Sequence, residues 1–107
     1  MSLRPPSQYA ASASAGGGSR LLTPLDHEIA AEKASSLGRA GERVDAALRH
    51  LRACGADAPE RAQCLKAASD AVYAYFIQRE LCGLRRHHDA IRDYGIPREV
   101  LVRLGAS

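Results

Sequence analysis

Small and apolar residues recur every three or four positions over Ala30–Leu51, which is the spacing of one face of an α-helix. Thr23 is a suitable N-cap ahead of this pattern, and Pro24 fits the first helical position. Gly55 stands where a left-handed residue would end the helix. The sequence therefore predicts a long helix over residues 24–54.

A second helical pattern begins at Asp57, which together with Glu60 forms an Asp-x-x-Glu capping pattern. The apolar spacing then continues to Gly95, so we expect a helix over residues 58–94. Gly83 lies inside it, where glycine costs about 1 kcal/mol relative to alanine, and a kink or break there is the alternative. The proline that follows predicts a short third helix over residues 97–104.

The short connection between the two long helices makes them antiparallel neighbours. Strand-forming aromatic residues are few, with one Phe, four Tyr and no Trp. We therefore predict an all-α domain over residues 23–107, built as an antiparallel helical hairpin plus a short C-terminal helix. Residues 1–22 contain two adjacent prolines and three consecutive glycines, and their apolar residues have neither helical nor strand spacing. This composition predicts a disordered N-terminal tail.

The second helix is apolar over more than half of its circumference between Val72 and Leu84, which one partner helix cannot cover. Small domains often compensate for a small core by self-association. We therefore predict a homodimer in which two hairpins form a four-helix bundle, and the same surface would also suit a helical partner protein. The expected interface residues are Tyr73, Tyr75 at the rim, Ile77, Leu81, Leu84, His88 and Ile91.

The net charge of +3 comes from 15 Lys and Arg residues against 12 acidic ones. A protein that binds polyanions usually gathers its positive charge on one face, whereas here acidic residues are interspersed with the basic ones. This pattern favours a solvated surface over nucleic-acid binding. The alternative is a nucleic-acid-binding regulator that uses Arg79, Arg85, Arg86, Arg92, Arg98 and Arg103.

Three cysteines, Cys54, Cys64 and Cys82, form no CxxC pair and follow no secretory signal, which predicts free thiols in a reducing cytoplasm. Cys54 and Cys64 bracket the turn of the hairpin. A disulfide between them would require Cα atoms within about 7 Å, and free thiols are the preferred interpretation.

A metal- or thiol-dependent sensor is a further alternative, with His27, His87, His88 and Cys82 as its candidate residues. His87 and His88 are adjacent, so on a helix they point about 100° apart and cannot bind one ion together. No ligand spacing matches a known metal motif, and we predict neither a metal nor another cofactor.

Arg79 lies close to the apolar face of the second helix, and we expect it to pair with Glu28 or Glu32 across the hairpin. The chain contains no phosphate loop, nucleophile elbow, paired-carboxylate site or zinc ribbon, so the sequence predicts no catalytic residue and no enzyme. No stretch approaches the roughly 20 apolar residues of a membrane span. The sequence thus favours an interaction or regulatory module.

Two segments, Arg79–Arg85 and Asp93–Leu101, resemble a family of small bacterial all-α proteins of unknown function. Asp26–Ile29 and Glu32–Lys33 are similar to the upstream part of that family. The resemblance covers about residues 25–105. It implies a bacterial, cytoplasmic setting and no activity, cofactor or catalytic residue.

Overall fold

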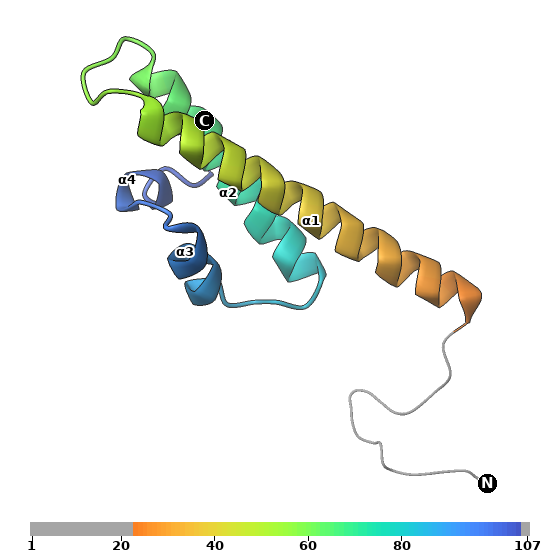
Figure 1. Cartoon of the computed structure of the whole chain (residues 1–107). Helices are drawn as coiled ribbons and strands as arrows, with labels where there is room; N and C mark the ends of the chain where they lie inside the picture. The colour runs from red at the N-terminus through yellow and green to blue at the C-terminus, as the bar shows by residue number, and fades with distance from the viewer. Residues whose placement is uncertain (1–22, 106–107) are drawn as a thin grey trace, which may run out of the picture. The chain divides into compact units, whose positions relative to one another are not determined.

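The structure is a computed structural model that describes residues 23–105, and this part of the chain contains four helices and no strand (Figure 1). The predicted all-α class is confirmed, and the predicted tail over residues 1–22 lies outside the described residues. The helices are α1 (Pro24–Ala53), α2 (Arg61–Leu81), α3 (His88–Tyr94) and α4 (Arg98–Leu101).

The described residues fall into two units, which divide between Ala31 and Glu32. In the first unit, the described residues form the beginning of α1. The Asp26 amide donates to the Thr23 hydroxyl at 3.0 Å, and the Thr23 amide donates back to the Asp26 carboxylate at 3.1 Å. This reciprocal capping satisfies amides that the helix itself leaves without a partner. It confirms Thr23 as the N-cap.

In the second unit, α2 runs back alongside the C-terminal part of α1, so the two helices form the predicted hairpin (Figure 1). Its core is a contiguous cluster of buried apolar residues from both helices and from the C-terminal segment. Its fully buried large side chains are Leu48 and Val44 from α1, Val72 from α2 and Val100 from α4.

The end of α1 differs from the prediction, because Gly55 does not adopt a left-handed conformation. The last carbonyl groups are capped from the next helix instead. The Arg61 guanidinium donates to the Leu51 carbonyl at 3.3 Å and to the Cys54 carbonyl at 3.2 Å. A cation at a helix C-terminus also interacts favourably with the helix dipole. Arg61 therefore replaces the expected glycine as the terminator of α1.

The predicted continuous helix over residues 58–94 is wrong, because α2 begins at Arg61, without the expected side-chain cap, and ends at Leu81. Gly83 has a φ of 89°, in the left-handed region. The Leu84 amide donates to the Arg79 carbonyl at 2.9 Å, and the Gly83 amide donates to the Glu80 carbonyl at 3.0 Å. This pair of bonds is a Schellman motif, which ends a helix and turns the chain. The break that was the alternative at Gly83 is therefore the observed structure.

After the turn, α3 and α4 lie against α2 (Figure 1). Gly95 is left-handed and ends α3, and Ile96 after it is buried. The Ser69 hydroxyl of α2 donates to the carbonyl of Val100 at 3.3 Å. The third predicted helix, over residues 97–104, is shorter than expected, since only α4 is helical and turns follow it. The C-terminal segment thus completes the core.

Candidate functional site

One face of α2 presents large apolar side chains to solvent. Tyr73, Ile77 and Leu81 follow one another at a spacing of four residues and are 48%, 40% and 62% exposed. Leu84 follows just beyond the helix end and is 43% exposed. We refer to these four residues as the α2 stripe. Exposed apolar side chains that gather in one place are typical of an interaction surface.

The remaining predicted interface residues lie elsewhere. His88 is exposed at the start of α3, and Ile91 is half-buried against the core. Tyr75, predicted at the rim, is only 8% exposed, so its predicted position is wrong. The reason is the turn after α2, which returns α3 and places the Tyr94 ring 5.4 Å from the Tyr75 ring in an edge-on arrangement.

The C-terminal segment explains why part of the wide apolar surface of α2 is covered and part is open. It buries the side of α2 that carries Ser69, Val72 and Phe76. At the other side it comes near only one end of the stripe, where a Cβ on Gly105 would lie 3.6 Å from the Tyr73 ring. The chain therefore covers one side of this surface by itself and leaves the stripe open.

The turn between α2 and α3 is held by a side-chain network around His87. The Arg79 Nε donates to His87 Nδ1 at 3.0 Å, and an Arg79 Nη2 donates to the Arg86 carbonyl at 2.8 Å. The other ring nitrogen, Nε2, lies 3.0 Å from the Glu80 carboxylate. The His87 ring also stacks on the Phe76 ring, with 4.1 Å between the ring centroids. His87 is therefore a structural residue of the turn.

This network corrects the expected pairing of Arg79. Its guanidinium points to the turn and lies 5.8 Å from the Tyr75 ring centroid. Glu32, one of its two predicted partners, pairs instead with Arg39 of its own helix at 3.4 Å. The other predicted partner, Glu28, belongs to the first compact unit.

The arginines predicted for nucleic-acid binding are divided among different roles. Arg79 holds the turn, and Arg92 pairs with Asp89 at 3.0 Å and with Asp93 at 3.5 Å. Four others are exposed on the surface of the C-terminal part: Arg85, Arg86, Arg98 and Arg103. Of these six arginines, Arg79 and Arg92 are thus engaged with neighbouring parts of the described chain.

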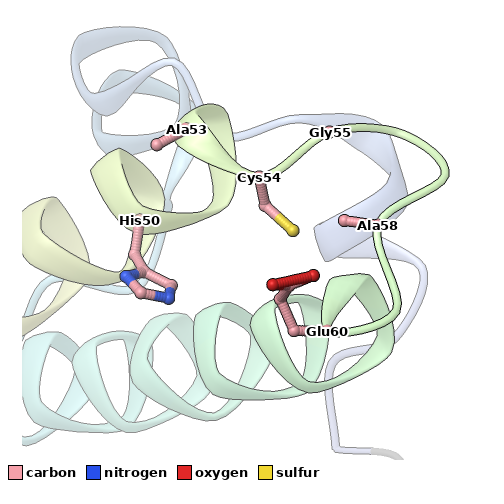
Figure 2. A pocket seen from close by; sticks show the side chains of 6 residues that line it. All are labelled: His50, Ala53, Cys54, Gly55, Ala58 and Glu60. Atoms are coloured by element: carbon pink, nitrogen blue, oxygen red, sulfur yellow. The ribbon is translucent and has the colours of Figure 1, made fainter.

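A pocket of about 210 Å³ lies at the turn between α1 and α2 (Figure 2). Figure 2 shows the Cys54 sulfur and the Glu60 carboxylate pointing into the same space, with His50 one helical turn further back on α1. The lining residues are His50, Ala53, Cys54, Gly55, Ala58 and Glu60. The pocket therefore combines a thiol, an imidazole and a carboxylate.

Partial burial, and then the neighbouring Cys64 thiol of α2, raise the pKa of the Cys54 thiol above its usual value. Both cysteines are free thiols. The third cysteine, Cys82, lies at the end of α2, with its sulfur 3.9 Å from the Lys33 carbonyl. The structure therefore brings the two cysteines of the hairpin turn together.

Sequence reasoning missed Arg61, which organises this turn. Besides capping α1, its guanidinium forms a 2.6 Å ion pair with Glu99 of α4. A single arginine next to a turn carries no recognisable signal, because its partners come from distant parts of the chain.

Within residues 23–105, no group of three or more His, Cys, Asp and Glu side chains is arranged to hold a metal ion. None of the helices described has the length and apolar character needed to cross a membrane.

The comparisons with known proteins give a family and no function. The chain shows no significant similarity to a curated protein or to a solved structure. The model of one family matches residues 1–107, the full length of the chain. This agrees with the resemblance to proteins of unknown function that the sequence itself indicated. The chain belongs to a family of unknown function, DUF6665.

Proposed function

We propose that this protein is an interaction module that acts as a homodimer, with the α2 stripe as its interface. The observation that carries the proposal is the asymmetry of α2. Its inner side is closed by the chain itself, whereas Tyr73, Ile77, Leu81 and Leu84 remain 40–62% exposed. Burial of such a side chain from full exposure contributes about 1.5–3 kcal/mol, so covering the half that is still exposed contributes roughly half of that for each of the four.

A two-fold arrangement suits this surface. In a symmetric dimer the same patch of both copies meets, so a stripe along one helix packs against its own copy. Each hairpin would contribute α1 and α2, which gives the four-helix bundle expected from the sequence. A small helical domain also gains a larger core in this way.

The distribution of charge supports a protein partner over nucleic acid. Arg61 and Arg79 are turned toward neighbouring parts of the chain, and Arg92 is paired with acidic residues. A nucleic-acid interface would gather such side chains on one face. We place the protein in the bacterial cytoplasm, a setting that rests on the family resemblance and on the odd number of cysteines.

The test is the absolute mass in solution, measured by light scattering after size exclusion at low and high salt. We expect twice the mass of one chain at both salt concentrations, because an apolar interface is insensitive to ionic screening. Ile77→Glu and Leu81→Glu should convert the dimer to a monomer, because each would bury an unpaired charge in the interface.

Val102→Glu is the matched control, since Val102 is 67% exposed and lies outside the α2 stripe. It should leave the dimer intact. A wild-type monomer at high protein concentration would refute the homodimer. A dimer that survives both stripe substitutions would show that another surface forms the interface.

A further inference from the structure

We propose that Cys54 and Cys64 form a reversible dithiol site, which closes to a disulfide when the protein meets an oxidised low-molecular-weight thiol. The proposal concerns the hairpin turn and does not depend on the α2 stripe or on the dimer.

The turn is built so that the two thiols meet. Cys54 directly follows the last residue of α1, and Cys64 lies in the first turn of α2. Arg61, one helical turn before Cys64, donates to the Cys54 carbonyl at 3.2 Å and so holds the start of α2 against the end of α1. The Cys64 thiol is one of the groups that raise the pKa of the Cys54 thiol, so the two side chains are neighbours across the turn.

The two sulfurs differ in their access to solvent. Cys54 is half-buried and lines the pocket of about 210 Å³, whereas Cys64 is only 4% exposed. A small reagent that enters the pocket thus reaches Cys54 first (Figure 2). This difference assigns Cys54 as the attacking thiol and Cys64 as the resolving thiol.

The chemistry is thiol–disulfide exchange in two steps. The Cys54 thiol first loses its proton to solvent. Its thiolate attacks one sulfur of R–S–S–R, which forms Cys54–S–S–R, breaks the reagent's S–S bond and releases RS⁻. The Cys64 thiolate then attacks the Cys54 sulfur and releases the second RS⁻. Together the two protein thiols give up two electrons and two protons, and the reagent leaves as two molecules of RSH.

The surroundings of Cys54 slow its reaction with a disulfide reagent. Its raised pKa means that the thiolate, which is the attacking species, is scarce at neutral pH. The neighbouring Glu60 carboxylate acts in the same direction. Closure should therefore be slow at neutral pH and accelerate as the pH rises, which distinguishes this site from a highly reactive sensor cysteine.

Cys82 supplies an internal control. It is half-buried like Cys54, and its sulfur lies against the Lys33 carbonyl. It has the same opportunity to react with a reagent in solution but lacks the adjacent second thiol that Cys54 has. The proposal thus predicts two different products from two cysteines in one molecule.

To test the proposal, the full-length native protein is treated with oxidised glutathione, and the remaining thiols are then alkylated. The protein is digested with trypsin without reduction, and the peptides are mapped by mass spectrometry. Cleavage at Arg52, Arg61 and Lys66 places Cys54 on residues 53–61 and Cys64 on residues 62–66, so only a disulfide joins these peptides. Cys82 falls on residues 80–85. A non-reducing gel shows whether the bridge lies within one chain.

We expect the joined peptide to exceed any product that links Cys82 by roughly tenfold or more, because a neighbouring thiol has a high effective concentration. The bridge should form within a monomer-sized band, disappear with dithiothreitol and persist in Cys82→Ser. The proposal would be overturned if Cys54 and Cys64 each carried glutathione and no joined peptide formed. It would also be overturned if disulfides that include Cys82 formed in the same yield as the Cys54–Cys64 disulfide.

Two variants test the order of the steps. In Cys64→Ala, the mixed disulfide on Cys54 should accumulate because no second thiol resolves it. In Cys54→Ala, Cys64 should stay unmodified in the folded protein because it is buried. Equal modification of Cys64 in the second variant would overturn the assigned roles, and circular dichroism of both variants confirms that the helices remain.

Discussion

The Tyr94 hydroxyl lies directly over Gly41, so that a Cβ at this glycine would stand 2.5 Å from the hydroxyl oxygen. The same Cβ would lie 3.5 Å from the Tyr75 ring. This close approach is where the returning α3 meets α1. It depends on a residue without a side chain at the middle of a helix, where alanine would otherwise be preferred.

Gly41→Ala should therefore destabilise the protein by about 1–3 kcal/mol, because the overpacking exceeds the gain in helix propensity. Gly38→Ala is the matched control one helical turn away, since its Cβ would meet nothing within 4 Å. It should stabilise the protein by about 0.5–1 kcal/mol. Urea denaturation measures both, and equal effects of the two substitutions would contradict the close packing of Tyr94.

Gly83→Ala should destabilise the protein by about 1–2 kcal/mol, because an L-residue is unfavourable in the left-handed conformation that the Schellman motif requires. Gly55→Ala is the control. Its φ is not positive, and a Cβ there would meet nothing within 4 Å. The two free energies of unfolding from chemical denaturation should differ clearly, and a neutral Gly83→Ala would argue for a continuous helix.

The Tyr75–Tyr94 pair makes stability sensitive to alkaline pH. Burial, and then the hydrogen bond with Tyr75, raise the pKa of Tyr94. The folded state therefore holds the phenol proton more tightly than the unfolded state does. This contribution is fully present below the unfolded pKa of about 10 and is lost as the pH rises through the folded value.

We expect the free energy of unfolding to fall as the pH rises above about 10, the reference pKa of tyrosine. Tyr94→Phe should make this fall less steep. Because the pKa of Cys54 is also raised, the comparison is made in a Cys54→Ser background. Urea titrations at several pH values provide the measurement. An unchanged slope in Tyr94→Phe would show that Tyr94 does not couple to folding.

Arg79→Ala should destabilise the protein by about 1–2 kcal/mol, because it removes two hydrogen bonds that hold the turn between α2 and α3. Arg79→Lys should restore little of the lost stability, since an ammonium group cannot reproduce the two hydrogen bonds of the guanidinium. Arg85→Ala, at an exposed position, should have almost no effect. Thermal unfolding compares the three, and a harmless Arg79→Ala would exclude a role in the turn.

Local signals predicted α1 and the end of α3 well. Thr23 and its capping partner define the beginning of one helix, and Gly95 followed by Ile96 defines the end of another. Gly83 followed by Leu84 carries the same signature, a glycine with an apolar successor. This signature does not settle the prediction at Gly83, because the apolar residues before and after the break keep the same helical spacing. Periodicity alone therefore predicts that the helix continues.

The positions of Tyr75, Arg79 and Arg61 could not be derived in this way. Tyr75 is buried by Tyr94, and Arg79 is bound by His87, and both contacts exist only because the chain reverses after α2. Tyr73, Ile77 and Leu81 depend on helical spacing within α2 alone, and all three are exposed, as is Leu84 just beyond the helix. Contacts between distant segments are the information that the pattern lacks.

Surface turns usually tolerate added residues, but the connection between α1 and α2 has a constraint of its own. One guanidinium, that of Arg61, touches the carbonyls of Leu51 and Cys54 and the carboxylate of Glu99. A longer connection would loosen the position of that guanidinium relative to the end of α1, where two of its three partners lie. Related chains that keep this arginine should therefore vary in length elsewhere, and a fusion tag is better attached outside this connection.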